Sequence, residues 1–280
     1  MVKTAVITGG AGGMGLATAR ILGRDHRVVI SDVNQQRLDE AVTELAALGI
    51  DADAVPCDIT DRSSVDALLA RASEPGPVTA VVHTAGVSPQ MGSAETIMRI
   101  NALGTVHVTE ASLAVADEGF ALVNVASIAG HMLPGFLIPR RAYRLALTDL
   151  EKFARKMTAA ASRGPKAMRP GSAYSLSKNF VIWYSQRQAA SFGARGARVL
   201  SVSPGSFDTP MGRLEEKSGA GKLLDYAALK RFGDPAEIAE LLVFCASARP
   251  GYLTGTDILC DGGTRAGLGL RGMIAMARGD

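Results

Sequence analysis

Two side chains that could move a proton lie four residues apart in the stretch SAYSLSK: the phenol of Tyr174 and the ammonium of Lys178. On a helix this spacing places both on one face, one turn apart. A free phenol has a pKa of about 10, and a neighbouring cation favours the phenolate, so the pair could act as a general acid and base. A second tyrosine, Tyr143, is followed four residues later by Leu147, so no catalytic role is expected for it. Taken alone, a Tyr–Lys pair is more often an exposed helix face, so the rest of the chain must decide.

A glycine-rich turn follows the first apolar run of the chain. The stretch TGGAGGMG at residues 8–15 precedes a helical pattern, MGLATARIL. Glycines in such a turn let the backbone approach a pyrophosphate, and the N-terminus of the helix offers unpaired N–H groups. Two spacings fit: GxGxxG through Gly10, Gly12 and Gly15, and TGxxxGxG through Gly9, Gly13 and Gly15. A tight strand-to-helix turn without a ligand is the alternative interpretation.

An acidic residue stands where a dinucleotide site needs one. Asp32 ends the second apolar run, RVVISD, where a carboxylate accepts hydrogen bonds from an adenosine ribose and repels a 2′-phosphate. Neither Arg nor Lys occurs within the glycine turn or directly after Asp32. The pattern therefore predicts NAD as the cofactor, with NADP less favoured. The alternative role for Asp32 is that of a helix N-cap.

The elements that must position these residues alternate along the chain. Short apolar runs, typical of strands covered on both faces, lie at 4–9, 27–32, 52–58, 78–86, 121–127, 197–205 and 256–263. Helical patterns separate them, such as residues 34–49. This alternation predicts an α/β fold of the Rossmann type, a doubly wound parallel sheet of about seven strands flanked by helices. No repeat or linker divides residues 1–280, so a single domain is expected.

Composition excludes several other classes of protein. The formal net charge of +3 without clustered cations argues against a nucleic-acid partner. No apolar run is long enough to cross a membrane, and the N-terminus lacks a signal peptide, so a cytoplasmic protein is expected. The 3 cysteines and 4 histidines show no metal-ligand spacing, so we expect no metal site and reduced, packed thiols.

Eight stretches together resemble the short-chain dehydrogenase/reductase family, and they span nearly the whole chain in the order usual for that family. They are TGGAGGMG for the TGxxxGxG turn, CDIT (57–60) for the acidic adenine contact, HTAG (83–86) for NNAG, INALG (100–104) for the helix asparagine, ASIAG (126–130) for the catalytic serine, YSLSK (174–178) for YxxxK, SPGSFDTPM (203–211) for the nicotinamide segment and TGTDILCDGG (254–263) for the last strand.

The resemblance implies a role for each matched residue. Tyr174 would be the acid/base, Lys178 would lower its pKa and hold the nicotinamide ribose, and Ser127 would polarise the substrate oxygen. Asn101 would bend its helix and hold a water that feeds Lys178. The residues implied to contact the cofactor are Gly9, Gly13, Met14, Gly15, Asp32, Val33, Asp58, Ile59, Thr84, Ala85, Gly86, Tyr174, Lys178, Pro204, Gly205, Phe207 and Thr209.

The chain departs from the family pattern in two places. Thr84 replaces the second asparagine of NNAG. Ser127 lies 47 residues before Tyr174, far more than is usual, whereas Ser162 lies 12 residues before it. Spacing alone favours Ser162; we prefer Ser127 because it ends a predicted strand, where an α/β sheet presents its ligands.

The extra residues between Ser127 and Tyr174 form an insertion at about 131–170. A glycine-rich tail at about 264–280 ends the chain. Residues 140–162 predict one amphipathic helix, with its apolar stripe at Tyr143, Leu147, Leu150, Ala154, Met157 and Ala161. We expect this stripe to cover the mouth of the site or a subunit interface, since an exposed stripe is unfavourable.

The resemblance implies an NAD-dependent oxidoreductase that interconverts a secondary alcohol and a ketone. Its partners would be a small-molecule alcohol or ketone and further copies of the chain, in a homodimer or homotetramer. The alternative is a catalytically silent protein that binds or senses a nucleotide.

Overall fold

The computed structural model describes residues 3–217 and 220–269. The described chain forms a parallel sheet of seven strands in the order β3-β2-β1-β4-β5-β6-β7, which confirms the predicted fold class. The strands are β1 (Thr4–Thr8), β2 (Arg27–Asp32), β3 (Ala52–Pro56), β4 (Val78–His83), β5 (Ala121–Val125), β6 (Arg198–Pro204) and β7 (Asp257–Cys260). The winding reverses between β1 and β4, and in such sheets ligands bind beyond the carboxyl ends of the strands at that point.

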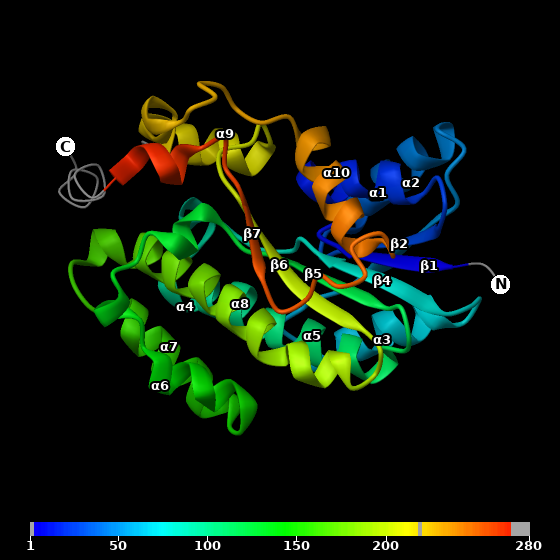
Figure 1. Cartoon of the computed structure of the whole chain (residues 1–280), viewed down its shortest axis with the longest axis horizontal. Coiled ribbons are helices and arrows are strands. Elements are labelled where there is room, and N and C mark those ends of the chain that lie inside the picture. Colours follow the sequence, from blue (N-terminus) through cyan, green and yellow to red (C-terminus); the bar gives the residue numbers. More distant parts are fainter. Residues whose placement is uncertain (1–2, 218–219, 270–280) are drawn as a thin grey trace.

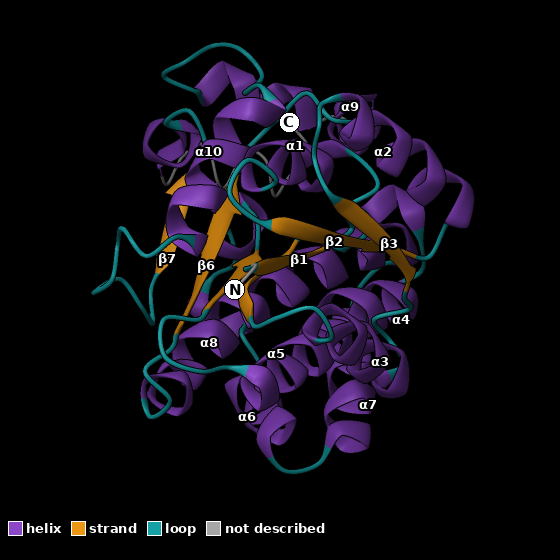
Figure 2. Ribbon diagram, turned by 90° about the vertical axis from the view of Figure 1, so that its right-hand side faces the viewer, coloured by secondary structure: helices purple, strands orange, loops and turns teal. Residues whose placement is uncertain are grey.

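Helices cover both faces of the sheet (Figures 1 and 2). Helices α1, α2 and α10 lie on one face, while α3, α5 and α8 lie on the other. The α-helices are α1 (Gly13–Leu22), α2 (Gln35–Ala47), α3 (Arg62–Ser73), α4 (Ala94–Ile97), α5 (Gly104–Val115), α6 (Arg140–Tyr143), α7 (Leu150–Ala161), α8 (Arg169–Gly193), α9 (Pro210–Lys217) and α10 (Pro235–Ala246). Short 3₁₀ turns are η1 (Pro89–Met91), η3 (Ile128–His131), η4 (Gly135–Leu137), η5 (Arg144–Leu147), η6 (Lys166–Met168) and η7 (Ala220–Tyr226); η2 (Met98–Leu103) is a π-helical turn.

The five inner strands are mostly buried because each face of the sheet packs against its own helices, whereas the edge strands β3 and β7 are partly exposed. Ile7 and Ile30 belong to the cluster shared with α1, α2 and α10, whereas their neighbours Val6 and Val29 belong to the cluster shared with α3 and α5. This two-sided burial explains why the strands read as continuous apolar runs in the sequence. The result is a rigid sheet whose carboxyl ends can hold a site.

The insertion does not form the single helix predicted for residues 140–162. The chain forms α6 and η5, leaves helical geometry at Thr148, and begins α7 at Leu150. Asp149 starts the new helix: its side chain accepts a hydrogen bond from the backbone N–H of Lys152 at 2.9 Å. A side-chain cap of this kind competes with continuation of the preceding helix. The prediction of one continuous helix was therefore wrong, because the helix breaks at Thr148.

The apolar side of the insertion packs against its own chain. Tyr143, Phe153 and Met157 are fully buried in one cluster with Phe180 and Tyr184 of α8, while Leu147 remains 42% exposed. Helices α6 and α7 therefore lie outside α8, on the side away from the sheet (Figures 1 and 2). Of the predicted glycine-rich tail, residues 264–269 are helical and the rest lies outside the described residues.

Candidate active site

The structure brings Ser127 and Tyr174 together although 47 residues separate them. Ser127 stands just beyond the end of β5, its oxygen accepts the backbone N–H of Ala129 at 3.2 Å, and its hydroxyl lies close enough to Tyr174 on α8 to favour the phenolate. Ser162, the alternative chosen by spacing, ends α7 in the outer layer. Ser127, which was preferred for its place at a strand end, is therefore the serine that lies beside Tyr174.

Lys178 lies near the same tyrosine and is held by a hydrogen bond to β5. Its ammonium donates to the backbone carbonyl of Val125, the last residue of β5, at 2.9 Å and lies 5.9 Å from the centre of the Tyr174 ring. Burial lowers the pKa of Lys178 to about 8, opposed by the negative charge of Glu215. The lysine thus links α8 to the end of β5, which Ser127 follows.

The electrostatics of the phenol differ from the sequence-based expectation. Burial, followed by the charge of Glu215, raises the pKa of Tyr174 above its usual value, while the bond with Ser127 opposes the rise. Lys178 was expected to lower this pKa, but burial and the charge of Glu215 together raise it. Glu215, on α9, is a site residue that sequence reasoning missed; burial raises its own pKa, and Lys178 opposes that rise.

Asn101 lies in the π-helical turn η2 and ties three elements together. Its side chain accepts from the backbone N–H of Val87 at 2.9 Å and donates to the carbonyl of Val87, also at 2.9 Å. It also donates to the hydroxyl of Ser177, the neighbour of Lys178, at 3.3 Å. A π-helical turn widens the helix backbone, which agrees with the bent helix that the resemblance implies.

A buried histidine joins this turn to the first strand. His83 contacts the hydroxyl of Thr8 at 2.7 Å through Nδ1 and that of Thr105 at 3.2 Å through Nε2. The hydroxyl of Thr105 donates its one hydrogen to the carbonyl of Asn101 at 2.7 Å, so it can only accept from His83. The imidazole therefore donates from Nε2 and accepts at Nδ1. Burial, with Lys178, lowers the pKa of His83 to about 3, so the imidazole stays neutral. This link was not expected from the sequence, although HTAG in place of NNAG was an available signal.

The glycine turn has the shape of a phosphate cradle. Gly9 has φ of 68°, and a Cβ there would lie 2.8 Å from the backbone N of Ala85; a Cβ on Gly15 would lie 2.3 Å from the carbonyl of Gly9. No side chain caps the start of α1, where Met14 follows Gly13. Backbone N–H groups at such a helix start suit an anion, so these residues fit a dinucleotide pyrophosphate.

Thr84 holds this turn to the end of β4. Its hydroxyl donates to the carbonyl of Thr8 at 2.7 Å, and the backbone N–H of Ala85 donates to the Thr8 hydroxyl at 3.4 Å. The departure from NNAG therefore keeps a hydrogen bond to the backbone beside the predicted cofactor cleft.

Asp32 ends β2, where its carboxylate accepts the backbone N–H of Asn34 at 3.1 Å, and it is not the N-cap of α2. The N-cap of α2 is Asn34, whose side chain accepts from the backbone N–H of Arg37, so the alternative role for Asp32 was wrong. Val33, next to it, is 72% exposed. Arg37 reaches back over the turn: its Nη2 lies 3.4 Å from the carbonyl of Ala11, and Nη1 lies 4.0 Å from Asp32. A cation is thus present at the turn, although none is adjacent in sequence.

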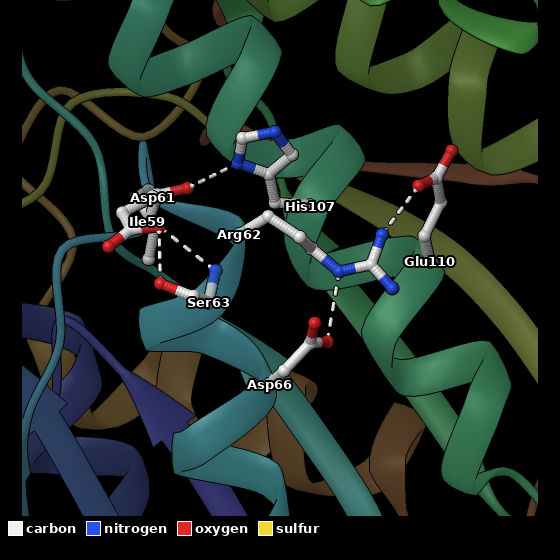
Figure 3. Close-up of polar contacts among 7 residues, drawn as sticks. All are labelled: Ile59, Asp61, Arg62, Ser63, Asp66, His107 and Glu110. Atoms are coloured by element: carbon white, nitrogen blue, oxygen red, sulfur yellow. Dashed lines mark hydrogen bonds and ion pairs between the residues drawn. The ribbon is translucent and has the colours of Figure 1, made fainter.

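The predicted adenine segment is held against α5 (Figure 3). The side chain of Asp58 accepts the backbone N–H of Thr60 at 2.8 Å, and the carbonyl of Ile59 lies 3.0 Å from Nδ1 of His107. Arg62 adds an ion pair with Glu110 at 2.8 Å. The same helix region therefore carries Asn101 at one end and supports the adenine segment further along.

The segment after β6 closes the opposite side of the cleft. Pro204 ends the strand, Gly205 follows it, and Thr209 accepts the backbone N–H of Gly212 at 3.0 Å. A Cβ on Gly13 would lie 3.7 Å from Thr209, so this segment faces the glycine turn. A Cβ on Gly86 would lie 3.5 Å from the ammonium of Lys178, so Gly86 stands beside that side chain. Phe207 is buried, and its ring packs beside Gly233, where a Cβ would lie 2.4 Å from a ring carbon.

Two further kinds of site are not found in the described part of the chain. No group of three or more His, Cys, Asp or Glu side chains among those residues could hold a metal ion. None of the helices described there is both long and apolar enough to cross a membrane.

Known proteins are similar to this chain in sequence and in fold. Residues 3–160 match the family model described as short chain dehydrogenase, and residues 140–265 match the model described as enoyl-(acyl carrier protein) reductase. The chain is 30% identical over 270 residues to the short-chain dehydrogenase/reductase bsc3 of Alternaria brassicicola, covering 95% of this chain and 97% of that protein.

Two further relatives show a similar extent of likeness. A 2,5-dichloro-2,5-cyclohexadiene-1,4-diol dehydrogenase, LinX, from Sphingobium indicum is 28% identical over 277 residues, covering 95% of this chain and 97% of that protein. A short chain dehydrogenase from Burkholderia cenocepacia solved with NADP superimposes with a TM-score of 0.74 at 24% identity, covering 94% of this chain and 98% of that one.

Proposed function

Because the chain belongs to the short-chain dehydrogenase/reductase family, we propose that it interconverts a secondary alcohol and a ketone, with NAD as the cofactor. The observation that carries this proposal is the meeting of Ser127, Tyr174 and Lys178 at the carboxyl end of β5. The diol dehydrogenase among the relatives supports an alcohol as substrate. The presence of Ser127, Tyr174 and Lys178 together argues against a catalytically silent nucleotide-binding protein.

Each side chain would have a separate task. Tyr174 takes the proton of the alcohol hydroxyl during oxidation and returns it to the carbonyl oxygen during reduction. Ser127 donates a hydrogen bond to the substrate oxygen and polarises it. Lys178 would hold the nicotinamide ribose, and Asn101 would support a water between itself and Lys178. When bound, the cofactor supplies the hydride chemistry.

The preference for NAD rests on Asp32. Its carboxylate stands at the carboxyl end of β2, where it would accept the ribose hydroxyls and repel a 2′-phosphate. Arg37 counters part of this charge from 4.0 Å, so we propose a moderate preference for NAD rather than exclusion of NADP. The short chain dehydrogenase from Burkholderia cenocepacia is in complex with NADP, so NADP is the alternative cofactor to be tested.

The remaining assignments follow from this function. We propose a small-molecule alcohol or ketone as the partner, no nucleic acid, a cytoplasmic location, and assembly as a homodimer or homotetramer. Light scattering of the purified protein would decide the number of subunits.

The deciding experiment screens secondary alcohols, cyclic diols, sugars and steroids for NADH formation. Binding of NADH is measured separately by its fluorescence, so that loss of turnover and loss of binding can be told apart. Tight binding of NADH without turnover of any alcohol, or of any ketone in reverse, would favour the silent nucleotide-binding protein.

A further inference from the structure

Tyr143, for which the sequence gives no role, reaches the catalytic helix from the insertion. The side chain is fully buried, and its hydroxyl lies 3.1 Å from the carbonyl of Leu176 and 3.0 Å from Oδ1 of Asn179, both on α8. The carbonyl of Leu176 lies within α8, where backbone carbonyls already accept the N–H four residues later. The side-chain oxygen of Asn179 has no such partner within the helix ladder, so the hydrogen bond from Tyr143 matters more for Asn179.

The other end of the Asn179 amide holds the serine turn. Nδ2 donates to the carbonyl of Gly130 at 2.7 Å, and Gly130 lies in η3, directly after Ser127. The contact is close, because a Cβ on Gly130 would lie 2.9 Å from the backbone of Lys178 and Asn179. The insertion, the catalytic helix and the serine turn therefore meet at one side chain.

The orientation of this amide is fixed by its neighbours. A carbonyl can only accept, so the amide nitrogen must face Gly130, and the amide oxygen must face the hydroxyl of Tyr143. Loss of the Tyr143 hydroxyl leaves this partly buried acceptor without its partner from the insertion, which favours rearrangement of its surroundings. Asn179 directly follows Lys178, so a rearrangement there acts on the catalytic helix itself.

We infer that Tyr143 and Asn179 are positioning residues that hold the turn of Ser127 in register with Lys178. The inference rests on the proposed function. The approach of Ser127 to Tyr174 and the hydrogen bond from Lys178 to the carbonyl of Val125 both join the helix to the end of this strand. The insertion thus supports the geometry of proton transfer from the outer side of α8, without contact with the substrate. Small displacements of reacting groups are costly, about 100-fold in rate for about 1 Å.

The test compares Tyr143→Phe and Asn179→Asp with Tyr184→Phe. Tyr184 is equally buried in the same aromatic cluster on α8, so its variant controls for removal of a buried hydroxyl. Asn179→Asp keeps an acceptor for Tyr143 but places a carboxylate oxygen against the carbonyl of Gly130. We expect both test variants to lower kcat by about 10-fold or more, with the Kd of NADH within about twofold of the wild type.

The double variant Tyr143→Phe/Asn179→Asp separates positioning from general loss of stability. Residues that act as one unit give non-additive losses, so the double variant is expected to be little worse than the worse single variant. Assays well below each melting temperature remove the effect of unfolding. Equal kcat values for Tyr143→Phe and Tyr184→Phe, or strictly additive losses, would overturn the inference. A wild type without dehydrogenase or reductase activity would instead overturn the proposed function.

Discussion

The guanidinium of Arg37 lies across the glycine turn, with one nitrogen 4.0 Å from a carboxylate oxygen of Asp32. A Cβ on Gly12 would come within 2.6 Å of Arg37, so the arginine rests directly on the turn. Helix α2 therefore brings a cation to the place where the sequence showed an acid alone. The two charges have opposite effects on a 2′-phosphate, which makes them a pair to be varied together.

We predict that Asp32→Ala shifts the cofactor preference toward NADP by about 10- to 100-fold in kcat/KM, because a repelling charge is lost and Arg37 remains. Arg37→Ala should shift the preference the other way, toward NAD. Arg20→Ala is the matched control, since Arg20 joins α1 to Glu44 of α2 away from the turn. Kd values of NADH and NADPH for each variant check the result. A wild type that prefers NADPH would contradict the role given to Asp32.

We predict that Tyr174→Phe lowers turnover by about 100- to 10,000-fold, because the proton carrier is removed. The Kd of NADH should change little, since the glycine turn and Asp32 are untouched. The fully buried Tyr184 provides the control, as Tyr184→Phe. Retention of activity in Tyr174→Phe would remove the phenol from the mechanism.

Glu215→Gln should move the pH dependence of alcohol oxidation toward lower pH. The negative charge of Glu215 disfavours the phenolate and raises the pKa of Tyr174; it also favours the ammonium of Lys178. Removing this charge lowers both pKa values, so the phenolate forms at a lower pH. The check is the pH at half-maximal kcat/KM, with Glu240→Gln, an exposed carboxylate on α10, as the control. An unchanged midpoint, or one moved to higher pH, would show that Glu215 does not act on the phenol.

Phe153→Ala should lower the free energy of unfolding by about 3–5 kcal/mol, because it opens a cavity between the insertion and α8. The phenylalanine is fully buried, with its ring 4.6 Å from that of Phe180 between centroids. Leu147→Ala, at a 42% exposed position in the same insertion, should change stability by less than about 0.5 kcal/mol. Denaturant titration measures both. Equal effects would mean that α7 does not depend on this contact.

The local features of the fold could be predicted because they depend on neighbouring residues. Apolar runs around Val6, Val29 and Val123 marked strands, since two-sided burial leaves no polar alternation. Ser127 was preferred to Ser162 from its place at a strand end. The broken helix at Asp149 was missed, because apolar spacing continued across it while a side-chain cap decided the local geometry.

The residues that were missed act across the fold. Arg37 reaches the glycine turn from another helix, Glu215 approaches Lys178 from a segment after β6, and Tyr143 meets Asn179 across the insertion. None of these contacts has a fixed spacing in the sequence. A repeat of strands and helices predicts where a cleft lies, but not which distant charges and hydroxyls converge on it.

The length of chain between Ser127 and Tyr174 has a consequence for folding. Closing a loop costs entropy that grows with the logarithm of its length, so 47 residues in place of about a dozen add on the order of 1 kcal/mol to the formation of this pair. Docking of Phe153 and Met157 onto α8 offsets that cost, but only after the insertion has folded. During refolding, activity should therefore return later than the helical and sheet signals, and its recovery would time the docking of the insertion.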